Sequence, residues 1–336
     1  TMTMPEFLEA RYQSEHIKMI SAVIIFIFLL PYSASIFKGL GHLFESTFHI
    51  SFDFALIILV VITGIYLVLG GYFAVTVTSF IQGIIMLVGA VIMICVLVYK
   101  AGGLTEAITT VNTNYPEHVP VAQQPSWLTI ASLIFMTSVG SWGLPQMVQK
   151  FYAIKNEKVI PKAAIITTIF ALVIGITAYG SGILSHVFFD NNTVPKMANG
   201  GVNYDQIMPN LLAIKLPEAL LAIIMLLILS ASMSSLASLV LVSASSIAVD
   251  LYKGYLKKDV NEKTSLIIMR SFSVLFIFAT YLISKLQLGF IVTMQSLSWG
   301  VLSGAFLAPY VFAIYSKKVT KAAAYAGIYS GAGSAI

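Results

Sequence analysis

Eight serines crowd into the eighteen residues from Leu229 to Ser246, inside a long apolar stretch that reads LSASMSSLASLVLVSASS. In a helix, a serine hydroxyl lies near the backbone carbonyl three or four residues earlier. The hydroxyls of Ser234 and Ser235 would therefore converge near the carbonyl of Ala231. Three neutral oxygens at one place suit a hard monovalent cation, provided that another helix supplies further oxygens. The spacing thus indicates a cation site that needs no carboxylate.

The same serines also fit a packing role. Small residues spaced four apart let membrane helices approach closely. Ala231 with Ser235, and Ser234 with Ser238, have this spacing. From the spacing alone, packing and ion binding both remain open, and packing is the commoner outcome.

Acidic residues lie only near the ends of the apolar segments. We interpret two of them, Asp53 and Asp250, as boundary charges that face water. This argues against a proton relay built from carboxylates in this part of the protein. No Ser-His-Asp set, metal-ligand cluster or phosphate-binding loop is recognisable in the sequence, so an enzyme is not expected.

The composition is typical of an integral membrane protein. Of the 336 residues, 58% are hydrophobic and 10% are charged, and the mean hydropathy is +0.90. A soluble domain of this size needs far more charge to cover its surface. The formal net charge of +5 comes from basic residues scattered among short loops, which favours a membrane topology over nucleic-acid binding.

A spanning helix needs about 20 mostly apolar residues. Eight segments meet this requirement and a ninth begins near 321; the eight are 17–38, 52–70, 73–99, 128–149, 161–189, 211–250, 265–285 and 288–316. Only Gly70 and Gly71 separate the second segment from the third, which predicts a tight hairpin. As one helix, 211–250 would be roughly 60 Å long, about twice the bilayer core. It must extend past the membrane, tilt or include a non-spanning turn, and Pro217 marks a start.

Charge in the loops predicts the orientation of these segments. Fourteen of the nineteen Lys and Arg residues fall in four regions of the chain. If the chain crosses the membrane eight times, all four regions lie on the same side. Because short cytoplasmic loops carry an excess of Lys and Arg, we expect that side to be the cytoplasm. The external side then receives Lys38, Lys100, Lys196, Lys215 and Lys285. The chain is accordingly expected to be a multi-pass protein of the plasma (inner) membrane.

Five stretches of the chain carry a recognisable pattern. They are SASMSSLASLVLVSASSIAVDLYK, GGYFAVTVTSFIQGIIM at 70–86, TMPEFLEARYQ, SWGLPQMVQKFYAIKNEK and GVLSGAFLAPYVFAIYSKKVTKAAAYAGIYSG. The first resembles the signature helix of the sodium/solute symporter (SSS) family, and the second resembles the Gly-Gly hairpin and helix of that family. The other three match further blocks, so the resemblance covers essentially the whole chain.

The resemblance implies an all-α membrane fold of the LeuT type, in which two inverted five-helix repeats bind substrate and ion midway, at broken helices. In that frame, 1–127 forms core helices three to five with an external loop, 128–318 forms core helices six to ten, and 319–336 begins a further transmembrane helix. The chain is then expected to be an internal piece of a longer protein, without the first two core helices and the C-terminal end. Such a piece alone is not expected to transport.

In the family, the main sodium site takes a backbone carbonyl and two hydroxyls from the signature helix. By position, these ligands are Ala231, Ser234 and Ser235, so the resemblance implies that the cation is Na+. The other serines of the helix keep the packing interpretation: Ser243, Ser245 and Ser246.

The chain departs from the family pattern at two positions near this site. Many members have Asp where this chain has Ser79, and Ser where it has Ala237. A second sodium site is therefore not expected. We assign Ser79 and Ser238 to the path by which the ion leaves.

Solute-binding candidates are polar or aromatic residues on the broken helix and the helix facing it: Ser138, Ser141, Trp142, Gln295, Ser298 and Trp299. Glycines next to Pro145 loosen the helix there and free backbone groups. Trp142 and Trp299 fit packing or an interfacial belt equally well. Gln146, near the cytoplasmic end, is interpreted as a solvated or capping group.

The sequence thus predicts a symporter that imports a small organic solute together with sodium across a lipid bilayer. Proline transporters of the family have Trp and Tyr where this chain has Thr137 and Ser141, so the solute stays open among amino acids, monocarboxylates, pantothenate and sugars. One alternative is a transporter-like sensor domain of a signalling protein, with which Ser79 is compatible. The other is coupling to protons through an acid in the missing helices. The sequence does not indicate an oligomeric state.

Overall fold

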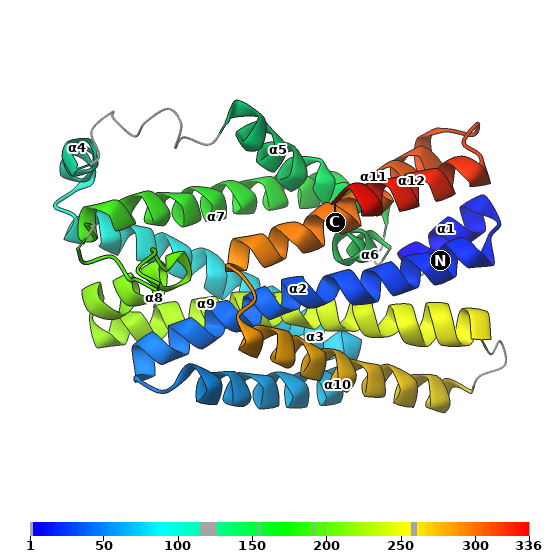
Figure 1. The fold of residues 1–336 in the computed structure, drawn as a ribbon, viewed down its shortest axis with the longest axis horizontal. Helices are drawn as coiled ribbons and strands as arrows, with labels where there is room; N and C mark the ends of the chain where they lie inside the picture. The colour runs from blue at the N-terminus through cyan, green and yellow to red at the C-terminus, as the bar shows by residue number, and fades with distance from the viewer. Residues whose placement is uncertain are drawn as a thin grey trace.

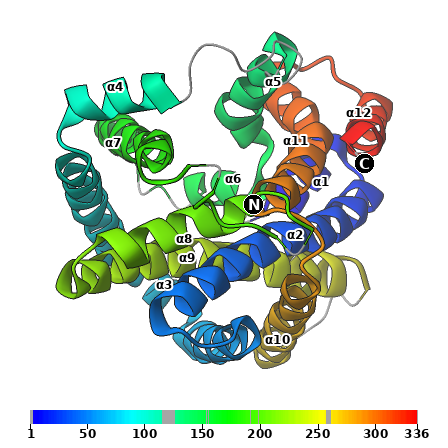
Figure 2. The same ribbon diagram turned by 60° about the vertical axis from the view of Figure 1, so that its left-hand side comes forward.

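The computed structural model describes residues 3–114, 126–152, 154, 156–190, 192–197, 199–256 and 261–335, without the side chains of 68–76, 255, 256 and 262. Within these ranges the regular elements are helices, apart from an isolated antiparallel bridge. The long helices run along the long axis of the molecule (Figure 1). Figure 2 shows α4 and α7 on one side of the bundle and α11 and α12 on the opposite side. The all-α prediction is confirmed.

The N-terminal part supplies the helix around which much of the bundle packs. A short helix α1 (Met4–Tyr12) begins at Thr3, whose Oγ1 accepts a hydrogen bond from the backbone N–H of Glu6 at 3.2 Å. It leads into α2 (Glu15–Phe48), which packs against α3, α8, α9, α10 and α11. Because α2 packs against these five helices, its polar residues can contact residues from several of them.

The next helical stretch, α3 (Phe52–Lys100), folds back on itself. Tyr66 Oη and Thr78 Oγ1 lie 2.5 Å apart in a hydrogen bond. Twelve residues of a straight helix would separate them by about 18 Å, too far for these side chains to meet. The predicted reversal of direction is therefore present. The predicted boundary between two helices at Gly70 and Gly71 is wrong, because the backbone stays helical from Phe52 to Lys100.

Two helices form the wall beside the second arm of α3. The short helix α4 (Leu104–Asn114) packs against α7 (Ile160–Phe188), and α7 packs along α3. The 3-10 turn Glu157–Val159 leads directly into α7. Within the described chain, no residue in the most apolar 18-residue stretch of this helix is buried, as expected of a helix that faces lipid.

The predicted segment 128–149 is a broken helix. It consists of α5 (Trp127–Ser138), a 3-10 turn (Gly140–Gly143) and α6 (Pro145–Phe151). Proline lacks the N–H that would continue the helical ladder, and glycine tolerates the change of direction. The sequence GSWGLP therefore ends one helix and begins another.

The long apolar run 211–250 divides where Pro217 predicted. Helix α8 (Tyr204–Lys215) ends before this proline, and α9 (Glu218–Ser245) begins directly after it. Helix α9 continues as a π-helical segment (Ser246–Leu256). The run thus contains the end of a short non-spanning helix followed by one long helix.

The C-terminal part consists of three helices, α10 (Glu262–Leu286), α11 (Ile291–Tyr315) and α12 (Lys321–Ala335). Helices α11 and α12 touch through their backbones. A Cβ atom added at Gly331 would lie 1.9 Å from the carbonyl oxygen of Gly304. Only glycine therefore fits at this contact.

Eight apolar helical stretches correspond to the eight predicted segments. Among the described residues, six stretches are long and apolar enough to cross a membrane, and two shorter apolar stretches, Phe52–Leu67 and Trp127–Ser138, account for the others. The main core lies between α2, α9, α10 and α11, and its largest fully buried side chains include Phe37, Phe276 and Phe306. The serine helix α9 is thereby held at the centre of the bundle.

Candidate functional site

The predicted ion-binding serines lie on α9 where it packs against α3 and α2. Ser234 Oγ donates a hydrogen bond to Ser79 Oγ at 3.1 Å, although the two residues are 155 positions apart. Ser238 Oγ donates to the carbonyl of Ser234 at 3.2 Å. The two residues assigned to the release path therefore both contact Ser234.

A small cavity, which we call the serine cavity, opens beside these hydroxyls. It has a volume of about 60 Å³ and is lined by Tyr32, Gln146, Met147, Lys150, Ser234, Ser235, Ser238 and Leu239. These residues come from α2, α6 and α9. Ala231 lies one helical turn before Ser234 and Ser235 in the same uninterrupted helix. Side chains of three helices thus surround a space with room for a small ion and a few water molecules.

The position of α6 in this arrangement is fixed by contacts with α11. Ser303 Oγ donates a hydrogen bond to the carbonyl of Gly140 in the 3-10 turn at 2.8 Å. At Gly143 the backbone approaches α11 so closely that a Cβ atom would lie 2.7 Å from the N atom of Leu307. The break is therefore packed against a neighbouring helix, as a break at membrane depth requires.

Gln146 is the residue that the sequence interpretation placed wrongly. Its side chain is 4% exposed and lines the serine cavity, so it is not a solvated group. Neither its Oε1 nor its Nε2 has a hydrogen-bond partner among the described residues. The interpretation assumed a helix that continues toward water, whereas the break turns α6 so that its first turn faces α9.

The sequence analysis also missed Tyr32 and Lys150 at this cavity. Tyr32 lies in the middle of an apolar helix, where a lone tyrosine is usually a packing residue. Lys150 was counted as a loop charge for orientation. Its position four residues after Gln146 on the same helix face is the one sequence signal that could have linked it to the site.

The candidates for solute binding on the broken helix do not line the serine cavity. Ser138 and Trp142 border a separate hollow of about 760 Å³ next to α7. Ser141 Oγ donates to the carbonyl of Ser138 at 3.0 Å, and the side chain of Trp142 is 55% exposed. Ser138 and Trp142 therefore face α7, and Ser141 bonds within the break itself.

The candidates on α11 lie nearer to the site. Ser298 is fully buried, and its hydroxyl donates to the carbonyl of Phe28 on α2. Trp299 packs edge-on against Tyr32, with ring centroids 5.8 Å apart, and so contacts a residue that lines the serine cavity. Gln295 is half-buried on the same helix. Of the three, Trp299 is the one that lies beside the serine cavity.

Asp250 differs from its expected role as a boundary charge. Its side chain is fully buried, and Thr3 Oγ1 donates a hydrogen bond to its Oδ1 at 2.6 Å. Its Oδ2 has no hydrogen-bond partner among the described residues. The start of α1 covers the π-helical segment and removes this carboxyl from water. Asp53 fits the expectation, since its side chain is 57% exposed and lies 3.8 Å from Lys285.

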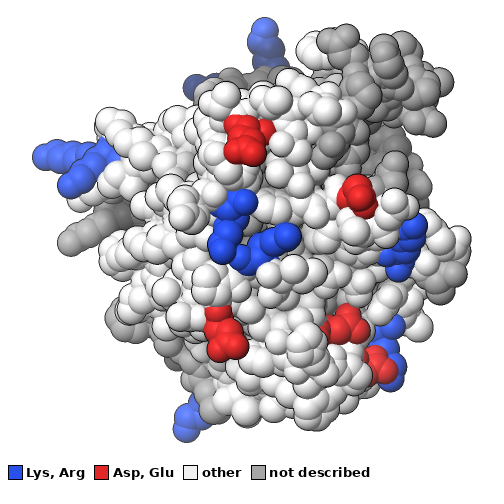
Figure 3. Space-filling model, turned by 90° about the vertical axis from the view of Figure 1, so that its left-hand side faces the viewer, with Lys and Arg blue, Asp and Glu red and all other residues white. Residues whose placement is uncertain are grey.

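A buried charge pair lies at the opposite, predicted external end. Lys38 Nζ is 2.6 Å from Asp205 Oδ2, and it also donates to the carbonyl of Gly289 at 2.7 Å. Asp205 accepts hydrogen bonds from the backbone N–H of Ile291. Figure 3 looks onto this end and shows basic and acidic side chains interspersed on an otherwise uncharged surface. The pair ties α8 to α2 and to the start of α11.

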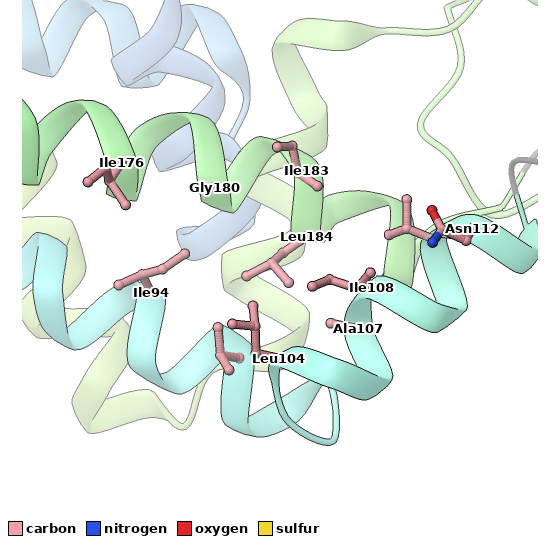
Figure 4. Close-up of a pocket in the computed structure, with 11 residues that line it drawn as sticks. Ile94, Leu104, Ala107, Ile108, Asn112, Ile176, Gly180, Ile183 and Leu184 are labelled. Carbon is pink, nitrogen blue, oxygen red and sulfur yellow. The ribbon is translucent and has the colours of Figure 1, made fainter. Parts of the chain in front are cut away.

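An apolar pocket between α3, α4 and α7 has a different character. Its volume is about 380 Å³, and Asn112 is the only polar side chain among its eleven lining residues. Figure 4 shows isoleucine and leucine side chains from all three helices around it. Such a lining offers no set of oxygens for a cation.

Comparison with known proteins identifies the family of the chain. The sequence matches the Sodium:solute symporter family over residues 1–331. It is 28% identical over 341 residues to a protein named sodium/proline symporter 2 of Staphylococcus saprophyticus, and 29% identical over 341 residues to a sodium/proline symporter of Staphylococcus aureus. Each match covers 98% of this chain and 64% of the relative, so the chain spans about two-thirds of the relatives' length.

The fold has a counterpart among solved structures. A Na+-coupled sialic acid symporter, solved in a substrate-bound outward-open state, superposes with a TM-score of 0.79. The match covers 99% of this chain and 76% of that one, at 18% sequence identity. The all-helical fold is therefore of the LeuT type, and the chain belongs to the sodium:solute symporter family.

Proposed function

We propose that this chain is the part of a sodium-coupled symporter that carries the ion site, and that the transporter imports a small organic solute across the plasma (inner) membrane. The observation that carries the proposal is the serine cavity, in which hydroxyls of α9 meet residues of a broken helix. Membership of the family and the fold support it. We assign 1–127 to the remainder of the first repeat, 128–318 to the second repeat and 319–336 to a further helix.

We propose that the carbonyl of Ala231 and the hydroxyls of Ser234 and Ser235 are ligands of the transported Na+. Neutral oxygens suit a hard monovalent cation, and no carboxylate lines the serine cavity among the described residues. Ser79 and Ser238 contact Ser234, which supports a release path that passes these two hydroxyls.

The solute class stays broad in this proposal. Two relatives are named sodium/proline symporters, and the structural neighbour is a sialic acid symporter, so amino acids and acidic sugars enter the test first. Monocarboxylates, pantothenate and neutral sugars complete the panel. We propose Trp299 as the first solute-binding candidate because it contacts Tyr32 at the serine cavity.

Uptake by the intact protein in proteoliposomes tests the proposal. Uptake of a solute from the panel is expected to require an inward sodium gradient, and equal uptake with potassium or choline would exclude sodium coupling. Ser234→Ala and Ser235→Ala are each expected to raise the sodium concentration for half-maximal uptake about tenfold, because a hydrogen-bond-like contact to a charged group contributes about 1.5–3 kcal/mol. Ser243→Ala is the control, since this buried hydroxyl lies on the same helix outside the cavity.

Proton coupling is the second candidate, and one observation favours it. Asp250 is a fully buried carboxyl whose Oδ2 has no hydrogen-bond partner among the described residues, and ionisable groups within transmembrane segments often serve transport. Uptake that follows an inward proton gradient in sodium-free buffer, and that Asp250→Asn abolishes, would favour this candidate.

A further inference from the structure

The amide of Gln146 is a buried polar group without a partner. Both of its polar atoms lack a hydrogen bond among the described residues, and its side chain is 4% exposed. Buried side-chain polar atoms almost always have a partner, so each exception requires a physical explanation. Leaving such a group unpaired costs about 1–3 kcal/mol, which favours an arrangement in which something binds it.

The amide cannot easily leave the cavity. On α6, Pro145 before it and Val148 two residues after it are buried, and Leu144 is fully buried. Gly143 packs against the backbone of α11, and Ser303 holds the carbonyl of Gly140. The short helix is therefore held in one orientation, and the amide is positioned toward α9 in advance.

The lining of the serine cavity determines what could bind there. The hydroxyls of Ser234, Ser235, Ser238 and Tyr32 and the amide oxygen of Gln146 provide neutral oxygen atoms. A volume of about 60 Å³ exceeds the roughly 10–15 Å³ that one water requires. A small cation with part of its hydration shell matches both the chemistry and the size.

Lys150 makes this a weak site for a cation. Lys150 is exposed and lines the same cavity, and a like charge nearby opposes the binding of a cation. An ion on a transport path must bind well enough to enter and weakly enough to leave. Neutral ligands beside a basic residue release the ion more readily than a carboxylate would.

We propose that Gln146 Oε1 is a ligand of the transported sodium ion at a temporary site, which the ion occupies after leaving Ser234 and Ser235 on its way to the cytoplasm. This inference rests on the proposed function. It adds a residue of the broken helix α6 to the ion path and explains why a glutamine is buried there without a hydrogen-bond partner among the described residues. The amide couples release to the helix break, because any movement of α6 moves this ligand.

The test compares Gln146→Leu and Gln146→Glu in the intact transporter, with Gln149→Leu as the matched control. Gln149 is the same residue type on the same short helix, and it does not line the serine cavity. Sodium-dependent uptake is measured at varied sodium concentration, and solute affinity is measured at saturating sodium. Surface expression of each variant is measured in parallel.

Gln146→Leu is expected to raise the sodium concentration for half-maximal uptake at least fivefold, without changing the solute affinity at saturating sodium. Gln146→Glu is expected to lower that concentration and to slow turnover, because a carboxylate holds the ion longer. An unchanged sodium dependence in both variants overturns the inference and leaves the proposed function intact. A change in solute affinity alone also overturns it, and a wild-type protein without sodium dependence overturns both. If Gln146→Leu does not fold, Gln146→Glu alone decides.

Discussion

The buried pair of Lys38 and Asp205 permits a quantitative prediction about stability. The two charged atoms are 2.6 Å apart, and the side chains are only 7% and 4% exposed. Lys38 also donates to Gly289, and Asp205 accepts from Ile291, so both groups have their hydrogen bonds satisfied. The perturbation is the removal of one charge while the shape is kept, as in Asp205→Asn or Lys38→Met.

Removal of one partner from a buried pair costs about 3–5 kcal/mol, because the other charge stays buried without compensation. The double variant Lys38→Met/Asp205→Asn leaves no uncompensated charge. It is expected to be more stable than the sum of the single effects predicts, by about 1–3 kcal/mol. The exposed pair of Asp53 and Lys285 at 3.8 Å is the control, and Asp53→Asn is expected to cost less than about 1 kcal/mol.

Thermal unfolding of the purified protein in one detergent measures these differences. Both single variants at the buried pair are expected to melt well below the wild type, and the double variant is expected to melt above the temperature that the sum of the two single effects predicts. An Asp205→Asn variant that melts like Asp53→Asn would refute the reasoning. Strictly additive effects in the double variant would refute the coupling between the two charges.

Two further predictions concern ion stoichiometry and helix packing. A second sodium site lacks ligands, because Ser79 stands in place of an acid and Ala237 in place of a hydroxyl. Reversal potentials are therefore expected to give one sodium ion per solute. A value near two would contradict this. Gly331→Val is expected to lower the free energy of unfolding by at least about 1–3 kcal/mol, because the added Cβ would lie 1.9 Å from the carbonyl oxygen of Gly304. Gly333→Val is the control, with nothing within 4 Å of an added Cβ, and equal melting temperatures for the two variants would contradict the packing argument.

Helix positions were predictable because they follow from local rules. Each apolar segment of sufficient length became a helix, since every backbone polar group must be bonded within the membrane. The start of α9 after Pro217 and the break before Pro145 follow from the missing N–H of proline. Ser234 and Ser79 could be named from the family pattern, although their hydrogen bond could not.

The remainder of the site depends on contacts that no local rule describes. The direction in which Gln146 points depends on how a short helix turns after a break, and the 3.6-residue period does not extend across that break. Asp250 is buried because Thr3, 247 residues earlier, covers it. Lys38 and Asp205, 167 residues apart, likewise meet only in the folded chain. Hydropathy indicates how deep in the membrane a residue lies. It does not indicate which residues of other helices that residue contacts.

The reversal within α3 bears on how the protein enters the membrane during synthesis. The chain has no charged residue between Asp53 and Lys100, so no basic group near the Tyr66–Thr78 contact anchors the bend to either leaflet. The insertion machinery receives two apolar arms whose own charges do not determine their orientation. We expect the flanking basic segments around Lys18 and Lys150 to impose that orientation. A topology reporter placed at the bend should switch sides when those segments are neutralised, and a reporter that stays in place would show that the arms orient themselves.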